Sequence, residues 1–238
     1  MASMMIIGGT RGLGGEIAAD FTRAGHRVVL ADEGAAPDGA HPYVALDLAD
    51  PKAPARAVAQ ALTHLPSLDA LVIAASAMES APIEQWTAAM WDRAAAINLR
   101  LPFLAVQAAL PALRESANAS VTLLSSTATL RGQPLTHGYQ ATKAGVAGLV
   151  RSLAAELGPD GIRVNAVLPG WLDTPLTQAY WATRENAAAE RALIEERIPL
   201  RRHGTAQEAA ALVCFLASPA ASYLTGAMLP VDGGDTAV

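Results

Sequence analysis

The sequence predicts an α/β fold in which helices cover both faces of one doubly wound, seven-stranded parallel sheet. Short apolar runs of strand length alternate with stretches of helical periodicity along the chain, a pattern typical of parallel sheets. A glycine-rich turn at residues 8–15 directly follows the first apolar run. Hydrophobic residues make up 52% and charged residues 16% of the 238 residues, which favours a large buried sheet over disorder.

The strands are predicted by short apolar runs that end at polar or turn residues. Because these runs alternate with helices, neighbouring strands are expected to be parallel. We expect strands over residues 4–7, 27–31, 43–46, 70–74, 121–125, 162–168 and 227–231.

Helices are predicted where apolar residues recur three and four positions apart. The first follows the glycine turn and is expected to end at Gly25, and a helix over 139–157 is expected to stop at Gly158-Pro159. Residues 33–42, rich in Gly, Pro, Ala and Asp, are expected to form a loop. Further helices are expected over residues 52–65, 84–99, 101–116 and 205–217, and a partly helical segment over 171–200. We expect a single domain over residues 1–238, in which 171–200 is a segment of mixed structure.

The composition argues against several classes of partner. The formal net charge of −5 gives no basic surface for nucleic acid. The single cysteine, Cys214, cannot form an intrachain disulfide and is expected to be a small core residue. The five histidines lack metal-ligand spacing, so no metal site is expected. Because no apolar run reaches about 18 residues, we expect no membrane span and a cytoplasmic protein.

The glycine-rich turn is a candidate phosphate-binding site. Strand 4–7 runs into Gly8-Gly9-Thr10-Arg11-Gly12-Leu13-Gly14, and a helix follows. This order places backbone N–H groups and a helix N-terminus where a pyrophosphate can bind. The spacing is Gly-x3-Gly-x-Gly and differs from the usual Gly-x-Gly-x-x-Gly fingerprint. A tight connection between strand and helix is the alternative interpretation.

Asp32 ends the second predicted strand, about 20 positions after the glycine turn, where an acidic residue suits the ribose hydroxyls of adenosine. Its carboxylate would also repel a 2′-phosphate. Arg11 favours the opposite choice, because a guanidinium can pair with that phosphate. We therefore expect NAD(H) as the cofactor, with NADP(H) as the alternative. A solvated loop aspartate is the simpler interpretation of Asp32.

Tyr139 and Lys143 lie four residues apart in a predicted helix and therefore share one of its faces. A lysine ammonium beside a phenol favours the phenolate and lowers the phenol pKa towards neutrality. Ser126, at the end of the preceding strand, can reach the same pocket only through the fold. The pattern Ser-x12-Tyr-x3-Lys indicates catalysis if the chain also builds a dinucleotide site. Otherwise Tyr139 and Lys143 are surface residues of an amphipathic helix.

These motifs together resemble the short-chain dehydrogenase/reductase superfamily over essentially the whole chain. The residues that carry the resemblance are Gly8, Gly12, Gly14, Asp47, Leu48, Asn98, Ser126, Tyr139, Lys143, Pro169, Gly170 and Thr174. The runs Ile198-Pro199-Leu200, Phe215-Leu216-Ala217-Ser218, Leu224-Thr225-Gly226 and Val231-Asp232-Gly233-Gly234 are especially similar to the branch that contains 3-oxoacyl-carrier-protein reductases and related sugar and alcohol dehydrogenases.

The resemblance implies a Rossmann-type fold and hydride transfer between a nicotinamide cofactor and a secondary alcohol or ketone. Tyr139 would be the general acid in reduction and the base in oxidation, and Lys143 would lower its pKa and bind the nicotinamide ribose. Ser126 would hold the substrate oxygen, and Asn98 would position a water in a proton relay to Lys143.

The resemblance also implies the residues that contact the cofactor. Asp47 would meet the adenine ring, and Leu172 and Thr174 would fix the nicotinamide carboxamide. The full set of expected contacts is Gly8, Thr10, Arg11, Gly12, Leu13, Gly14, Asp32, Asp47, Leu48, Ala74, Ala75, Tyr139, Lys143, Pro169, Gly170, Leu172 and Thr174.

Three features depart from the family pattern. Ile7 stands where relatives have threonine, and Ile73-Ala74-Ala75-Ser76 replaces their Asn-Asn-Ala-Gly. We hypothesise that packing of Ile7 against the Ile73 region replaces the lost hydrogen bonds. The alternative is a destabilised protein with weak cofactor affinity. The interval between Asp32 and Asp47 has room only for a loop, where relatives carry a helix.

The intact set of Asn98, Ser126, Tyr139 and Lys143 favours an NAD(P)-dependent oxidoreductase that acts on a small carbonyl or alcohol. A catalytically silent, dinucleotide-binding regulatory protein is the alternative. Relatives use helices equivalent to 101–116 and 139–157 as interfaces, so a homotetramer or homodimer is expected.

The substrate pocket is expected to be lined by residues 77–78, 128–137 and about 171–199. An apolar pocket is suggested by Met78, Leu130, Trp171, Leu172, Tyr180 and Trp181. His137 is expected to be a surface or capping residue. Arg131, Arg201 and Arg202 are expected at the surface, with contact to an anionic carrier as the alternative.

Overall fold

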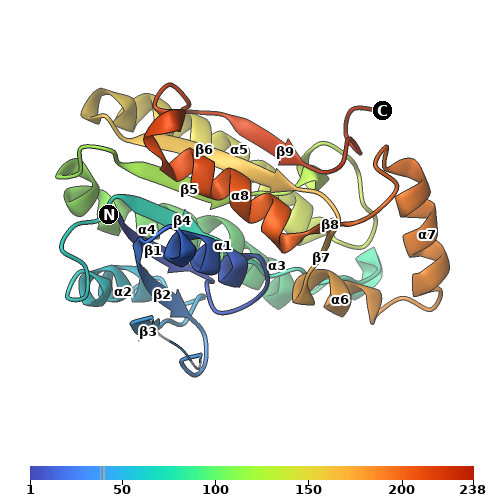
Figure 1. Cartoon of the computed structure of the whole chain (residues 1–238). Coiled ribbons are helices and arrows are strands. Elements are labelled where there is room, and N and C mark those ends of the chain that lie inside the picture. Colours follow the sequence, from blue (N-terminus) through green and yellow to red (C-terminus); the bar gives the residue numbers. More distant parts are fainter. Residues whose placement is uncertain (38, 40) are drawn as a thin grey trace.

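The predicted fold class is confirmed in the computed structural model, which describes residues 1–37, 39 and 41–238. In this part of the chain, seven parallel strands form one sheet in the order β3-β2-β1-β4-β5-β6-β9 (Figure 1). The order reverses between β1 and β4, which places a ligand crevice at the carboxyl ends of the strands. The strands are β1 Ser3–Ile7, β2 Arg27–Asp32, β3 Tyr43–Ala45, β4 Ala70–Ile73, β5 Ser120–Leu124, β6 Arg163–Pro169 and β9 Met228–Val231.

Helices cover both faces of the sheet, as expected. The helices are α1 Gly12–Arg23, α2 Ala53–Ala61, α3 Ala88–Ala95, α4 Leu101–Arg114, α5 His137–Leu157, α6 Pro175–Trp181, α7 Ala187–Arg197 and α8 Ala206–Ala217. Helices α1 and α8 lie on one face, and α2, α4 and α5 lie on the other (Figure 1). Successive strand residues alternate between the two cores, so Ile6 packs with α1 and α8 and Ile7 with the opposite helices.

The two helices predicted over 84–99 and 101–116 form one continuous helix from Ala88 to Arg114, so the expected break between them is wrong. A π-helical turn, Ala96–Arg100, joins α3 to α4. Pro102 has no N–H and cannot donate to the Asn98 carbonyl four residues earlier. At this point the helix widens by one π-helical turn, in which the Leu101 N–H donates to the Ala96 carbonyl five residues earlier, and the helix continues. The joined helix is long and apolar enough to cross a membrane by length and composition, and half of its most apolar window is buried in the fold.

The connection from β2 to β3 is an irregular loop at each described residue between Asp32 and Tyr43. Residues 38 and 40 of the predicted loop lie outside the described residues. The helix expected over 52–65 is shorter, because α2 ends at Ala61. The segment expected to be partly helical contains α6 and α7, and the short strands β7 Leu172–Asp173 and β8 Gly204–Thr205 pair on either side of them.

Ile7 and Ile73 are paired residues of the neighbouring strands β1 and β4. Both side chains are buried in the same hydrophobic cluster, which also contains Ala75. The Ile7 carbonyl accepts hydrogen bonds from the N–H groups of Ala74, at 2.8 Å, and Ala75, at 3.0 Å. The strand ends beside the glycine turn are thus held by apolar packing and backbone hydrogen bonds, as hypothesised for these departures from the family pattern.

Candidate active site

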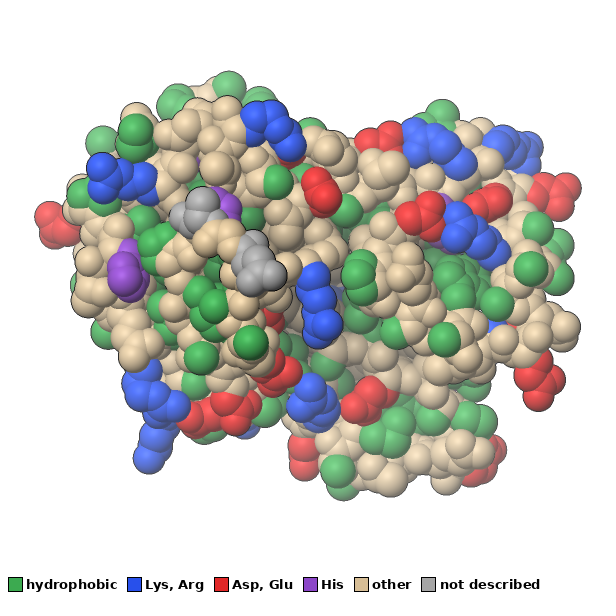
Figure 2. Space-filling model, turned by 60° about the horizontal axis from the view of Figure 1, so that its bottom comes forward, with side chains coloured by type: hydrophobic (Ala, Val, Ile, Leu, Met, Phe, Trp, Pro, Cys, Tyr) green, Lys and Arg blue, Asp and Glu red, His purple; other side chains and the backbone are tan. Residues whose placement is uncertain are grey.

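A cavity of about 480 Å³ lies at the carboxyl ends of the strands. Figure 2 shows the molecule hollowed near the centre of one face, with basic and acidic side chains around the opening. The sequence-predicted residues that line the cavity are Gly8, Arg11, Gly12, Leu13, Gly14, Asp32, Leu48, Ala74, Ala75, Ser126, Tyr139, Lys143, Pro169, Gly170, Leu172 and Thr174. Three predicted residues, Thr10, Asp47 and Asn98, do not line the cavity. Each forms hydrogen bonds with neighbouring segments instead.

The backbone of the glycine turn is packed so tightly that Gly8 and Gly14 have no room for side chains. Gly8 has φ +83°, and a Cβ there would lie 2.3 Å from the Ala75 nitrogen. A Cβ on Gly14 would lie 1.9 Å from the Gly8 carbonyl oxygen. Helix α1 begins at Gly12, and the side chain of its N-cap residue, Arg11, makes no capping bond to the described residues. The first N–H groups of α1 are therefore available to an anion.

Asp32 is held in place by the glycine turn. Its Oδ2 atom accepts hydrogen bonds from the Thr10 N–H, at 3.2 Å, and from the Thr10 hydroxyl, at 2.5 Å. Its Oδ1 atom accepts from the Glu33 N–H at 2.9 Å. Thr10 thus orients Asp32 and does not line the cavity itself. The two carboxylates of Asp32 and Glu33 face the same end of the cavity.

The loop after β3 departs from the expected adenine contact. Asp47 is exposed, and its carboxylate accepts a hydrogen bond from the Ala49 N–H at 2.9 Å, so it stabilises its own turn outside the cavity. Leu48 lines the cavity, and its N–H donates to Glu33 Oε1 at 3.4 Å. Glu33 Oε2 also lies 3.8 Å from the Arg93 guanidinium. Sequence reasoning missed Glu33, although it follows Asp32, and missed Arg93, which only the packing of α3 brings to the site.

Ser126, Tyr139 and Lys143 meet at the opposite end of the cavity. Ser126 lies just beyond β5, and its hydroxyl accepts a hydrogen bond from the Ala128 N–H at 3.1 Å. Tyr139 and Lys143 are buried on the face of α5 towards the sheet. Lys143 Nζ lies 5.7 Å from the centroid of the Tyr139 ring and donates a hydrogen bond to the Leu124 carbonyl at 2.7 Å.

The pKa values of this group are governed by burial. Burial lowers the pKa of Lys143 to about 7. Burial also raises the pKa of Tyr139, and a hydrogen bond with Ser126 opposes the increase. The expected lowering of the Tyr139 pKa by Lys143 therefore does not hold in this arrangement. The lysine points to Leu124, and a phenolate in a buried site is costly.

Asn98 lies on the π-helical turn, and its side chain forms hydrogen bonds with the loop after β4. Its Oδ1 atom accepts from the Ala77 N–H at 2.8 Å, and its Nδ2 atom donates to the Ala77 carbonyl at 2.8 Å. The same Nδ2 donates to the Thr142 hydroxyl at 3.1 Å. The Asn98 side chain is thus committed to positioning, while its main-chain carbonyl lacks an α-helical donor because residue 102 is proline.

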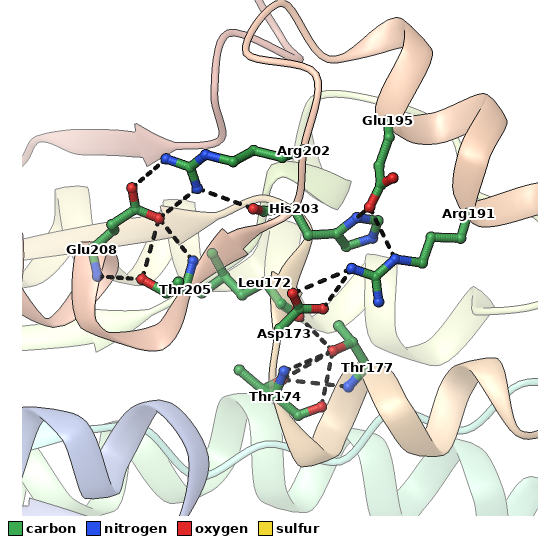
Figure 3. Close-up of polar contacts among 10 residues, drawn as sticks. All are labelled: Leu172, Asp173, Thr174, Thr177, Arg191, Glu195, Arg202, His203, Thr205 and Glu208. Carbon is green, nitrogen blue, oxygen red and sulfur yellow. Dashed lines mark hydrogen bonds and ion pairs between the residues drawn. The ribbon is translucent and has the colours of Figure 1, made fainter. Parts of the chain in front are cut away.

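Helix α6 carries cavity-lining residues and is fixed by the contacts drawn in Figure 3. The Thr174 hydroxyl caps α6 by accepting from the Thr177 N–H, and the Thr177 hydroxyl donates to the Leu172 carbonyl at 2.5 Å. The Arg191 guanidinium on α7 lies 2.9 Å from the Asp173 carboxylate. These contacts place Leu172 and Thr174 at the cavity wall.

The expected apolar pocket is only partly as predicted. Met78, Trp171 and Leu172 line the cavity, whereas Leu130 is 58% exposed. Tyr180 and Trp181 lie behind Trp171, whose ring stacks on Trp181 at a centroid distance of 5.1 Å. The wall also contains Gln133, Leu176, Thr177 and Ala179.

Most of the remaining candidate residues have structural partners. His137 begins α5 and packs edge-on against Trp86. Arg202 pairs with Glu208 at 2.6 Å, Arg131 binds backbone carbonyls near the end of the chain, and Arg201 is exposed. Burial raises the pKa of the Cys214 thiol to about 12, which leaves it unreactive at neutral pH. Within the described ranges, no three His, Cys, Asp or Glu side chains form a metal-binding group.

Comparison with known proteins shows extended similarity. The family model described as enoyl-(acyl carrier protein) reductase matches residues 8–236. A probable galactose dehydrogenase of Rhizobium meliloti is 33% identical over 97% of this chain and 93% of its own length. A 3-alpha-(or 20-beta)-hydroxysteroid dehydrogenase of Mycobacterium tuberculosis is 36% identical over 98% of this chain and 88% of its own length. The crystal structure of levodione reductase, 31% identical, superposes with a TM-score of 0.93 over 100% of this chain and 98% of that chain.

Proposed function

This chain belongs to the short-chain dehydrogenase/reductase superfamily, and we propose that it transfers a hydride between a nicotinamide cofactor and a secondary alcohol or ketone. The observation that carries the proposal is the meeting of Ser126, Tyr139 and Lys143 in one cavity with the glycine turn and Asp32. At one end of this cavity the glycine turn can bind the phosphates of the cofactor. At the other end Tyr139 can donate a proton to the substrate.

The residues at the cavity fit a dinucleotide. Gly8 and Gly14 allow the backbone of the glycine turn to pack tightly against residues 74–75 and against itself, beside the free N–H groups at the start of α1. Gly170 also lines the cavity, and it packs closely on Asp232, since a Cβ there would lie 2.7 Å from the Asp232 Cβ. Asp32 presents a fixed carboxylate to the ribose hydroxyls. When bound, the cofactor supplies or accepts the hydride.

The protein supplies the proton and the orientation. In reduction, the Tyr139 hydroxyl donates its proton to the substrate oxygen, which the Ser126 hydroxyl also holds. With a pKa of about 7, Lys143 can accept and release a proton at neutral pH. The Asn98 carbonyl, without an α-helical donor, is available to a water that returns a proton to Lys143.

The adenosine end supports a preference for NADH. Asp32 and Glu33 present two carboxylates there, which disfavour the 2′-phosphate of NADPH. Arg11 lines the same end and favours that phosphate, and Arg93 lies within 4 Å of Glu33, at 3.8 Å, where its charge is partly compensated. Glu33 and Arg93 offset each other, so the preference for NADH rests on Asp32, whose carboxylate Thr10 holds in place.

Assembly into a homodimer or homotetramer is part of the proposal. Trp91 on α3 and Phe103 on α4 are 47% and 43% exposed, although both are large hydrophobic side chains on one continuous helix. The two residues lie about three turns apart on this helix, and exposed apolar side chains of this size are typical of subunit contacts.

The proposal is tested by the oxidation of NADH by the purified protein with a panel of secondary ketones. Wild-type protein is expected to bind NADH and to reduce members of the panel. Failure to bind NADH and NADPH would reject the proposal. Binding without turnover of ketones or of the corresponding alcohols would favour the silent regulatory protein instead.

A further inference from the structure

The turn at residues 232–236 lies beneath the end of α7 and contains one buried carboxylate. Asp235 is 2% exposed, and its two oxygens accept hydrogen bonds from Arg197, the last residue of α7, at 2.7 Å from Nε and 3.1 Å from Nη2. Arg131 Nη1 lies 4.0 Å from the same carboxylate, and Arg131 Nη2 donates to the Asp235 main-chain carbonyl. Asp235 therefore joins α7 to the loop between Ser126 and Tyr139.

The turn is held by internal hydrogen bonds and is closely fitted against the end of α7. Asp232 accepts hydrogen bonds from the Gly234 N–H at 3.0 Å and the Thr236 N–H at 2.9 Å. Gly233 and Gly234 have φ of +63° and +89°, and a Cβ on either would lie within 3 Å of Ile198 or Pro199, at 2.8 and 2.9 Å. The turn is thus a fixed base against which the chain leaving α7 packs.

The same turn contacts the cofactor end of the site. The Gly170 N–H donates to the Val231 carbonyl at 2.9 Å, and the Gly170 backbone packs on Asp232. Asp235 accordingly lies between three segments that surround the cavity, namely loop 127–136, the strand end at Gly170 and the segment α6–α7. Figure 1 shows α7 beyond the carboxyl ends of the strands, connected to α6.

Helix α7 does not line the cavity, but it holds elements that do. Its Arg191 pairs with Asp173, next to the lining residue Leu172, and its Glu195 pairs with His203 at 2.7 Å (Figure 3). Arg191 and Glu195 are each about a third exposed, at 38% and 31%, whereas the Asp235 side chain is 3% exposed. Both the Arg197–Asp235 contact, in which Arg197 is 45% exposed, and the Glu195–His203 contact, in which the His203 side chain is fully buried, therefore anchor α7 at a buried partner. A buried carboxylate such as Asp235 is costly to leave without its partner.

We propose that Asp235 is a positioning residue that holds α7, and through it α6, closed over the substrate end of the cavity. The inference rests on the proposed oxidoreductase function. Asp235 touches neither substrate nor cofactor in this account. It acts through Arg197 on the helices that carry the wall residues Leu176 and Ala179, and through Arg131 on the loop that carries Ala128 and Gln133.

The test uses the full chain with Asp235→Asn, Arg197→Gln and the double variant. Asp160→Asn is the matched control, because Asp160 pairs with Arg114 at 2.8 Å at the opposite ends of the strands. Trypsin cleavage after Arg184 and Arg191 reports opening of α6–α7 without any substrate. The ketone that the wild type reduces fastest gives KM and kcat, and fluorescence titration gives the Kd of NADH.

In Asp235→Asn, cleavage after Arg184 and Arg191 is expected to rise about fivefold or more, and the KM of the ketone about five- to twentyfold. The Kd of NADH and kcat are expected to stay within about twofold, and the double variant to be no worse than Asp235→Asn. Unchanged cleavage and KM would overturn the inference, as would parallel loss of NADH binding and kcat or additive effects of the two substitutions. If the wild type reduces no ketone, the proposed function fails, and cleavage alone still decides the role of Asp235 in closing α6–α7.

Discussion

The Nζ atom of Lys143 donates a hydrogen bond to the Leu124 carbonyl oxygen at 2.7 Å, in a site where Lys143 is 2% exposed. Among the described acidic residues, none forms an ion pair with this lysine. Burial without a counter-charge lowers the pKa of Lys143 from its ordinary value of 10.5 to about 7. This lowered pKa makes folding of the cofactor-free protein depend on pH.

The first prediction concerns Lys143→Met and stability. Below pH 7 the folded protein bears the cost of a buried ammonium, and between pH 7 and 10.5 the unfolded chain alone keeps the proton, so stability rises with pH. The variant removes this rise, which amounts to about 1.4 kcal/mol per pH unit. Thermal melts of cofactor-free protein are expected to show Lys143→Met most stabilised, relative to wild type, at pH 6 and least at pH 9. A difference that is constant with pH would contradict the lowered pKa.

The second prediction concerns the adenosine end of the cavity. Asp32→Ala removes a carboxylate that Thr10 holds towards the cavity, so the Kd of NADH is expected to rise about tenfold while that of NADPH stays or falls. Asp47→Ala is the control. Because Asp47 is exposed and bonded to Ala49, its loss is expected to change either Kd by less than about twofold. Equal effects of the two substitutions in a fluorescence titration would refute this assignment.

The third prediction concerns Asn98, which is 1% exposed. Asn98→Ala leaves the Ala77 N–H and carbonyl without their partners, so the free energy of unfolding is expected to fall by about 2–3 kcal/mol and turnover to fall with it. Thr142→Val removes one of these bonds, with an expected loss of about 1 kcal/mol. Urea unfolding measures both. Equal losses in the two variants would mean that the Ala77 contacts carry little stability.

The fourth prediction concerns assembly. Light scattering coupled to gel filtration is expected to show a dimer or tetramer at micromolar concentration. Phe103→Asp is expected to shift it towards the monomer, because a carboxylate would replace an apolar contact. Leu193→Asp places the same charge at a residue of α7 that is 67% exposed and is expected to leave the mass unchanged. A monomeric wild-type protein would contradict the proposed homodimer or homotetramer.

The sheet could be predicted closely because buried parallel strands are continuous apolar runs. The residues from Val28 to Ala31, for example, are all buried in β2. The joined helix α3–α4 could not be predicted. In the sequence, Asn98 and Pro102 are residue types that usually mark the end of one helix and the start of the next. A π-helical turn changes the hydrogen-bond register without changing the apolar periodicity that indicates a helix, so it leaves no sequence signal.

The site was predictable where spacing along one element decides geometry, as for Tyr139 and Lys143 on α5 or the glycines before α1. Residues that reach the site through tertiary packing left no such signal. Arg93 faces Glu33 across 60 positions of sequence, and Asp235 meets Arg197 across 38. For Asp47 the family motif predicted a contact with the adenine ring. In the structure its carboxylate instead accepts a hydrogen bond from the Ala49 N–H of its own turn.

The most direct test of the proposed function is NADH oxidation with the ketone panel by wild type and Tyr139→Phe, after NADH binding has been measured for both. The account predicts a Kd within about twofold in the variant, because only a hydroxyl at the substrate end is removed, and turnover reduced by about 10²- to 10⁴-fold. Turnover by Tyr139→Phe at the wild-type rate would contradict the role of Tyr139 as the proton donor.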